Sequence, residues 1–130
     1  MIVGLGTDII DNRRIEHTIM KFGSKFKRRC FHYDEIKKSE KRLKQINFFA
    51  KRYAAKEACA KALGTGLAKG VFWKDIEVYN NNNGKPLIKL HNKALSILNK
   101  NFNFPCKIEL SLSDEKNYSI ANVIIFRYEK

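Results

Sequence analysis

The stretch QINFFAKRYAAKEACAKAL, residues 45–63, carries the strongest helix signal in the chain. Alanine is abundant in it, which favours a helix. Its apolar side chains recur near one helical face, namely Phe49, Tyr53, Ala60 and Leu63. Gly64 and Gly66 follow and predict the end of the helix. Because small residues allow close packing, we expect this helix to lie at the centre of the fold, with its charged side chains bordering a cleft.

The residues before this helix predict one strand followed by short helices. Residues 2–10 are rich in β-branched side chains and predict a strand. Asp11 or Asn12 is a suitable N-cap for a helix over about 13–22. Residues 24–44 predict short, strongly basic helical pieces. The first third of the chain therefore combines one strand with a basic helical region.

The residues after the helix predict mostly strands. An Asn-Gly pair, which favours a tight turn, lies between two short strand patterns, and a second hairpin follows. The expected elements are strands at 75–79 and 86–90, a helix at 92–100, and strands at 107–113 and 118–128 joined by a turn at 114–117. No repeat or linker divides the chain, so we predict a single α+β domain over residues 1–130 with an antiparallel sheet and a long central helix.

Composition limits the function classes. The 130 residues include 26 Lys and Arg against 13 Asp and Glu, a net charge of +13, which indicates an anionic partner or substrate. No apolar run is long enough to span a membrane, and the N-terminus lacks the basic start of a signal peptide. The three cysteines are widely separated, and the three histidines are not spaced to complete a zinc site. We therefore expect free thiols in a reducing cytoplasm.

The positive charge is concentrated in residues 13–52. This segment contains 14 basic and four acidic side chains, a net charge of +10. One interpretation is a surface that binds an acidic partner, and the alternative is a solubilising surface. Nucleic acid is a further candidate ligand, because aromatic residues such as Phe48, Phe49, Tyr53 and Phe72 accompany the basic ones.

Several charged residues are candidates for chemistry. Arg52 and Lys56 are four residues apart on the predicted helix, as are Glu57 and Lys61, so each pair shares a stretch of helix surface. These charges either form a solvated face or line a site. Asp8 lies near the end of the first predicted strand, where it either caps the strand or joins a second carboxylate, such as Glu57, to bind Mg²⁺.

Three segments carry a family resemblance, supported by a turn in mid-chain. They are GLGTDIIDNRRIE (4–16), FAKRYAAKEACAKALGTG (49–66) and LSLSDEKNYSIANVII (110–125), and the turn is NGKP (83–86). In this order they resemble the motifs of the short bacterial type of 4′-phosphopantetheinyl transferase, the holo-[acyl-carrier-protein] synthases. The resemblance covers essentially the whole chain and implies the fold of that family.

The resemblance implies a reaction and roles for individual residues. The 4′-phosphopantetheine arm of coenzyme A would pass to a serine of apo acyl carrier protein, in fatty acid biosynthesis, and adenosine 3′,5′-bisphosphate would leave. Asp8 and Glu57 would hold Mg²⁺ on the diphosphate, Glu57 would also orient a water that takes the serine proton, and Lys61 would stabilise the leaving phosphate. The implied coenzyme A contacts are Arg52, Lys56, Lys61, Gly64, Ser111 and Ser113, with Arg52 favoured for the 3′-phosphate.

The resemblance also implies partners. The first helix and its neighbours would dock the acidic helix of acyl carrier protein through Arg13, Arg14, Lys21, Lys25 and Arg28. Ile15 and Met20 would either add apolar contacts to that surface or belong elsewhere. A homotrimer with active sites at its subunit interfaces is expected, with no membrane association.

One position departs from the family pattern. Asp114 stands where the family usually has a histidine that can donate to a phosphate. The resemblance therefore carries no histidine role over to this chain. Three alternatives follow: a slower enzyme, use of Lys116 instead, or Asp114 as a water-mediated metal ligand. Two alternatives to the transferase stay open at this point: a basic nucleic-acid-binding module and a catalytically impaired relative that still docks a carrier protein.

Overall fold

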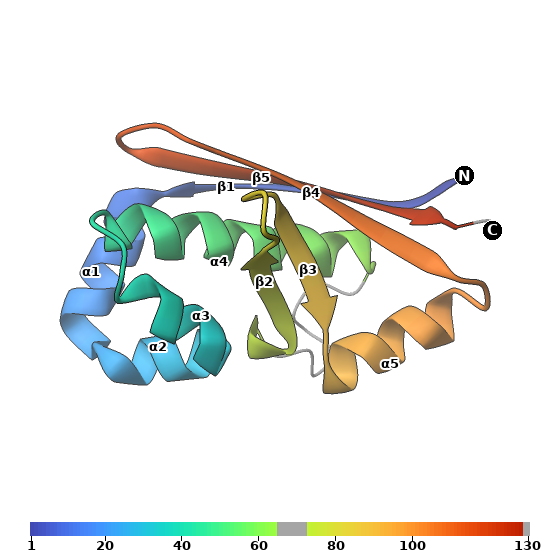
Figure 1. The fold of residues 1–130 in the computed structure, drawn as a ribbon, viewed down its shortest axis with the longest axis horizontal. Coiled ribbons are helices and arrows are strands. Elements are labelled where there is room, and N and C mark those ends of the chain that lie inside the picture. Colours follow the sequence, from blue (N-terminus) through green and yellow to red (C-terminus); the bar gives the residue numbers. More distant parts are fainter. Residues whose placement is uncertain (65–72, 129–130) are drawn as a thin grey trace.

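A three-stranded antiparallel sheet lies along one side of the long helix α4 in the computed structural model, which describes residues 1–64 and 73–128 (Figure 1). The strand order is β1–β5–β4, so the N-terminal strand pairs with the C-terminal one. The bounds are Ile2–Asp11 for β1, Gln45–Ala62 for α4, Cys106–Asp114 for β4 and Tyr118–Arg127 for β5. The hairpin of β4 and β5 and the central helix confirm the sequence-based expectation.

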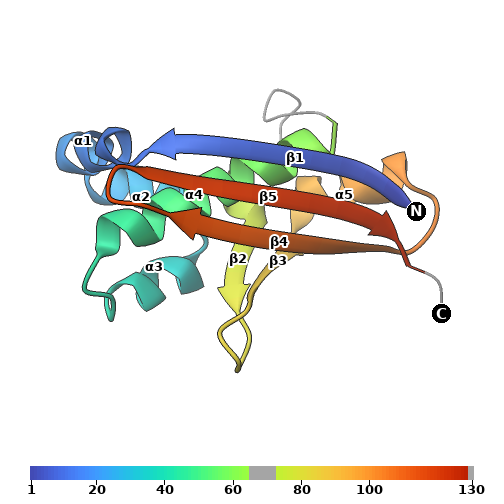
Figure 2. The same ribbon diagram turned by 90° about the horizontal axis from the view of Figure 1, so that it is seen from above.

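Three short helices cluster beside the N-terminal part of α4, on the side where β1 ends (Figures 1 and 2). Asp11 caps the first of them, because its carboxylate accepts a hydrogen bond from the backbone N–H of Arg13 at 2.9 Å. The basic residues 24–44, which were predicted to form short helical pieces, contain two separate helices that follow this first one. The bounds are Asn12–Phe22 for α1, Ser24–Cys30 for α2 and Tyr33–Ser39 for α3.

A second, two-stranded sheet packs against α4 and β4, and α5 follows it. One antiparallel sheet was expected, but residues 1–64 and 73–128 form two, because within them β2 and β3 pair with each other and not with the larger sheet. A short 3₁₀ turn precedes β2, so this strand begins at residue 76 instead of the expected 75. The bounds are Trp73–Asp75 for the 3₁₀ turn, Ile76–Asn80 for β2, Pro86–Leu90 for β3 and Asn92–Asn101 for α5.

The core centres on α4, whose small residues let the sheet approach closely. Ala54, Ala55 and Ala58 are completely buried. β1 crosses the helix so tightly that a Cβ atom on Gly6 would collide with the carbonyl oxygen of Ala58. In the described residues, no helix is both long and apolar enough to cross a membrane.

Candidate active site

Asp8 and Lys61 form an ion pair between β1 and the C-terminal part of α4. Asp8 shares the inward face of β1 with the buried Gly6 and Ile10. The ammonium group of Lys61 donates hydrogen bonds to Asp8 Oδ1 at 3.1 Å and to the carbonyl oxygen of Thr7 at 2.9 Å. The Lys61 side chain is 53% exposed and that of Asp8 is 18% exposed, so a ligand can reach the pair.

Glu57 lies one helical turn before Lys61 on α4. Its Oε1 accepts a hydrogen bond from the indole N–H of Trp73 at 3.1 Å. Burial raises the pKa of Tyr53 to about 12, and the charges of Glu57 and Asp8 both add to that rise. Both carboxylates thus act on the same phenol, and Glu57 shares one side of α4 with Lys61.

The chemistry of this group suits a phosphate ligand that carries a metal ion. Asp8 and Glu57 offer only oxygen donors, the kind that Mg²⁺ prefers, so the donor set fits that ion. Lys61 supplies a cation that can leave Asp8 and pair with a phosphate oxygen. Carboxylates for a metal and an ammonium group for an anion are thus present side by side.

Arg52 projects from a different side of the same helix. The step of five positions from Arg52 to Glu57 corresponds to a rotation of about 140° around the helix axis. Arg52 is 4% exposed; its Nη2 donates to Asn80 Oδ1 at 2.7 Å, and its guanidinium lies 4.2 Å from the ring centre of Phe48. Burial lowers the pKa of Arg52 to about 10. Its Nε is buried and has no hydrogen-bond partner among the described residues.

Lys56 does not occupy the phosphate-binding position expected from the sequence. Its side chain is completely buried, and its ammonium group donates to Glu35 Oε1 at 2.6 Å and to the carbonyl oxygens of Trp73 and Ile76. Burial lowers the pKa of Lys56 and raises that of Glu35, while each partner's charge opposes the other's shift. All three donors are engaged, so Lys56 holds α3, α4 and β2 together and is not available to coenzyme A.

A strongly basic cavity of about 750 Å³ opens beside Arg52. Segments from the α3–α4 connection, α4 and the β2–β3 turn line it, together with the end of β4. The basic side chains of its lining are Lys38, Lys41, Arg42, Lys44, Lys51 and Arg52. Such a concentration of positive charge favours a multiply charged anion.

Asp114 is the acidic residue among the described lining of this cavity. Its carboxylate accepts a hydrogen bond from Asn47 Nδ2 at 2.7 Å and lies 3.6 Å from the ammonium group of Lys51. These two contacts neutralise and orient it, so the family's histidine position is filled here by a paired carboxylate at the exposed edge of the cavity. Lys116 does not line the cavity.

Two of the expected coenzyme A contacts lie on the far face of the sheet. Ser111 and Ser113 on β4 are exposed and pair with Asn122 and Ile120, whose side chains point away from α4. Within one chain they are therefore separated from Asp8 by the sheet itself. Gly64 follows α4 with a φ of +84°, a conformation that favours glycine, and an added Cβ would meet nothing within 4 Å. Gly66 lies outside the described residues.

The five basic residues expected to dock a protein are all exposed on α1 and α2, namely Arg13, Arg14, Lys21, Lys25 and Arg28. Beside them is an apolar groove of about 440 Å³ whose lining includes Phe22, Phe26, Tyr53 and Trp73. Ile15 is buried in the core, whereas Met20 is 80% exposed. The groove ends near Glu57, because Trp73 lines it and also donates to that carboxylate.

Sequence patterns did not point to every residue near the site. Trp73 contacts Glu57, and its one signal was that it is the only tryptophan in the chain. His32, Glu77 and His91 also come together, although they are far apart in the sequence. Nothing in their local sequence indicates this contact, since it depends on how α3 packs against the β2–β3 sheet.

Comparisons with known proteins agree on one family. A model of the 4′-phosphopantetheinyl transferase superfamily matches residues 4–123. The holo-[acyl-carrier-protein] synthase of Rhizobium meliloti is 48% identical over 127 residues, which cover 96% of this chain and 91% of that protein. The crystal structure of the synthase from Neisseria meningitidis has a TM-score of 0.87 at 36% identity, covering 98% of this chain and 100% of the other. The Helicobacter pylori synthase in complex with coenzyme A has a TM-score of 0.79 at 30% identity, covering 94% and 99%.

Proposed function

This chain belongs to the 4′-phosphopantetheinyl transferase superfamily, and on that premise we propose how its own residues carry out the reaction of a holo-[acyl-carrier-protein] synthase. The enzyme transfers the 4′-phosphopantetheine arm of coenzyme A to a serine hydroxyl of acyl carrier protein. The observation that carries the assignment of roles is the contact of Asp8 with Lys61, which lies one helical turn after Glu57 on α4.

Asp8 and Glu57 hold Mg²⁺ on the diphosphate of coenzyme A in this proposal. The ion supplies charge neutralisation at the phosphorus that is attacked. Lys61 turns from Asp8 to a phosphate oxygen and stabilises the charge that develops on the leaving bisphosphate. Glu57 orients a water that relays the proton of the serine hydroxyl to the Glu57 carboxylate. Trp73 supports this role, because its indole N–H fixes the carboxylate at 3.1 Å.

The 3′-phosphate of coenzyme A binds in the basic cavity, with Arg52 as its main ligand. The guanidinium is already held by Asn80 and Phe48, so little side-chain freedom is lost on binding. Asp114 lowers the positive charge of this cavity, and its contacts with Asn47 and Lys51 keep it compatible with a nearby phosphate.

Each active site lies between two subunits of a homotrimer. Support comes from the rotation of about 140° between Arg52 and Glu57 on α4, since one elongated ligand cannot easily reach both sides of the same helix. The exposed sheet face adds to this support. Leu5 and Ile9 of β1 are 67% and 60% exposed, which is typical of a surface that another subunit covers. Ser111 and Ser113 lie on that face and would meet the neighbouring subunit.

Acyl carrier protein docks on α1 and α2. The exposed basic residues attract its acidic helix, and the groove lined by Phe22 and Phe26 accepts apolar side chains beside the charges. The groove leads toward Glu57, so a docked serine would arrive at the metal side of the site. We also propose a cytoplasmic location, since the free thiols of Cys30, Cys59 and Cys106 suit a reducing compartment.

The test is a transfer assay with coenzyme A, Mg²⁺ and apo carrier protein, followed by mass spectrometry of the carrier. The wild-type chain should add the phosphopantetheine mass, and Glu57→Gln should lower the rate by about 10²–10⁴-fold, because the amide keeps the Trp73 contact but neither accepts a proton nor ligates the metal well. Glu40→Gln, an exposed carboxylate outside the site, should retain the wild-type rate.

Two results would contradict the assignment. Full activity in Glu57→Gln would remove Glu57 from the chemistry. Absence of transfer by the wild-type chain, with intact carrier-protein binding, would indicate the impaired relative. The nucleic-acid alternative predicts instead a salt-sensitive binding of RNA without any transfer.

A further inference from the structure

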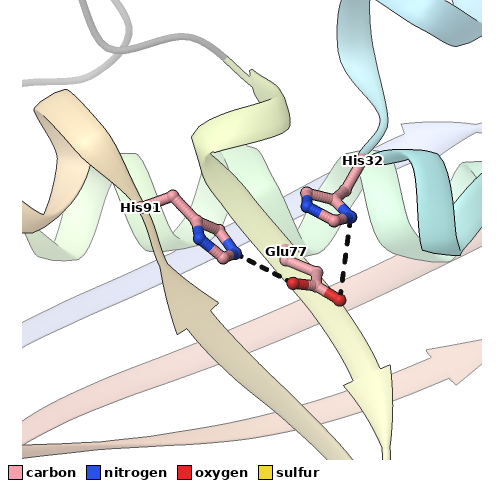
Figure 3. Close-up of side chains that lie close together, drawn as sticks. All are labelled: His32, Glu77 and His91. Carbon is pink, nitrogen blue, oxygen red and sulfur yellow. Dashed lines mark hydrogen bonds and ion pairs between the residues drawn. The ribbon is translucent and has the colours of Figure 1, made fainter.

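His32, Glu77 and His91 form a compact cluster that does not line the basic cavity beside Arg52 (Figure 3). His91 Nε2 lies 2.8 Å from Glu77 Oε1, and His32 Nδ1 lies 3.9 Å from Glu77 Oε2. The two imidazole rings stack, with centres 5.1 Å apart and planes inclined by 16°. One carboxylate is thus flanked by two imidazoles, each toward a different oxygen.

Three separate elements position these side chains. His32 is the N-cap residue of α3, Glu77 lies on β2, and His91 is the N-cap residue of α5 just after β3. The backbone N–H of His91 donates to the carbonyl oxygen of Asp75 at 2.8 Å, which fixes the approach of its ring to β2. The cluster is therefore built by the packing of α3 and α5 against the smaller sheet, and not by one flexible loop.

The cap contact of α3 involves one of the cluster's nitrogens. His32 Nδ1 accepts a hydrogen bond from the backbone N–H of Asp34 at 3.3 Å, so an ion that binds this nitrogen has to replace that contact. The same Nδ1 faces Glu77. The Glu77 side chain is 11% exposed, whereas His32 and His91 are 32% and 27% exposed. The carboxylate is thus shielded from water, while the imidazoles leave an entry path for an ion.

We propose that His32, Glu77 and His91 bind one divalent transition-metal ion of the zinc type, with water completing its coordination. Two imidazoles and one carboxylate are a frequent ligand set for Zn²⁺ sites that keep an open position. The three ligand atoms all lie within 4.8 Å of one another. Tetrahedral coordination needs ligand atoms about 3.4 Å apart, so small side-chain rotations close the site.

The bound ion joins the turn between α2 and α3 to the β2–β3 sheet. The metal preference of this cluster differs from that of the Asp8 and Glu57 pair. Imidazole nitrogen suits zinc, cobalt or nickel, whereas carboxylates alone suit Mg²⁺. The sequence spacing of the histidines indicated no zinc site, and spacing along the chain carries no information on ligands that come from distant elements. The cysteines play no part in it, since Cys30 and Cys59 are buried and outside this cluster.

The test measures metal binding by the full chain without substrates and with Mg²⁺ in large excess, so that the carboxylate pair is occupied. Competition against a chromophoric chelator should give one Zn²⁺ per chain, and Co²⁺ should produce a visible d–d spectrum. His91→Gln should weaken Zn²⁺ binding at least about tenfold while keeping an amide near Glu77. His32→Ser should do the same and still cap α3, because serine is a good N-cap residue.

His17→Gln is the matched control, since it removes the remaining histidine, which is exposed on α1 and outside the cluster. Wild-type affinity in His17→Gln together with the losses above supports the site. Zn²⁺ binding that is unchanged in both cluster variants, or no binding by the wild-type chain at millimolar Zn²⁺, would overturn it. Circular dichroism of each variant shows whether its fold is intact, and His91→Gln decides alone if His32→Ser unfolds.

Discussion

Two lysines on α4 show how position decides the role of a residue. Lys56 is completely buried and bonded to Glu35, whereas Lys61 is half exposed beside Asp8. Five residues place them on different sides of the helix. Both match the family motif equally well in the sequence, yet only Lys61 has an ammonium group that a substrate can reach.

We predict that Lys56→Met destabilises the fold by about 3–5 kcal/mol, because it leaves the buried carboxylate of Glu35 without its charged partner. Urea denaturation followed by circular dichroism measures this change. The double variant Lys56→Met/Glu35→Leu should recover much of the loss, since no buried charge then remains. A single variant as stable as the wild-type chain would mean that the pair contributes only packing.

At the scale of single elements, α1 begins at an N-cap whose carboxylate is strongly perturbed. Arg13 donates hydrogen bonds to Asp11 from its backbone and its side chain and lowers the pKa of Asp11 from 3.8 to about 2. The folded-state pKa is depressed, so this contribution to stability is present above about pH 3.8 and is lost as the pH falls toward 2.

We predict from this cap that Arg13→Ala raises the pKa of Asp11 toward its ordinary value. An NMR titration of the Asp11 carboxyl group measures the effect directly. Arg14→Ala is the control, because Arg14 acts on Asp11 only through its charge and contributes least to the shift. An equal shift in both variants would show that general charge, and not the hydrogen bonds, sets the pKa.

The contact between β1 and α4 is the second element-scale feature. Gly6 allows it, since a side chain there would collide with the Ala58 carbonyl oxygen. We predict that Gly6→Ala costs at least about 1–3 kcal/mol of stability, because β1 must move away from the helix. The transfer rate should fall as well, since Asp8 moves with β1.

Thermal unfolding and the transfer assay together test Gly6→Ala. Lys89→Ala is a suitable control, because Lys89 is exposed on β3 of the smaller sheet and belongs neither to the contact between β1 and α4 nor to the exposed face of the three-stranded sheet. Normal stability and activity in Gly6→Ala would mean that the close approach is not needed for the site.

At the scale of the whole molecule, the three-stranded sheet leaves one apolar face uncovered. Leu5, Ile9 and Ile120 on it are 67%, 60% and 37% exposed. The pairing of Ile9 with Ile120 across β1 and β5 makes this patch continuous. Such a patch is typical of a surface buried between subunits, which agrees with the proposed homotrimer.

We predict that Ile9→Lys weakens trimer formation at least about tenfold, because it places a charge in the apolar interface. Sedimentation equilibrium measures the assembly. The control Tyr33→Lys changes a residue that is 71% exposed on α3, away from the sheet face, and should leave the trimer intact. A wild-type chain that sediments as a monomer would contradict the proposed assembly, as would an unchanged trimer in Ile9→Lys.

The sequence predicted most of the elements because their signals are local. The Asn-Gly turn, the Asp11 cap and the alanine-rich helix act within a few residues, and the structure confirms all three. The division into two sheets was not predicted, since strand pairing depends on residues far apart in the chain. Family motifs identified the candidate residues of the site, including Asp8, Glu57 and Lys61.

By itself, the sequence determined the family, the order of helices and strands, and the concentration of positive charge in residues 13–52. The tertiary structure alone decided that Lys56 is buried, that Arg52 is buried and bonded to Asn80, and that His32, Glu77 and His91 meet. The physical reason is how far apart in the sequence the interacting residues are. Motifs and helix caps depend on neighbours along the chain, whereas burial of a charge and convergence of distant side chains depend on how whole elements pack.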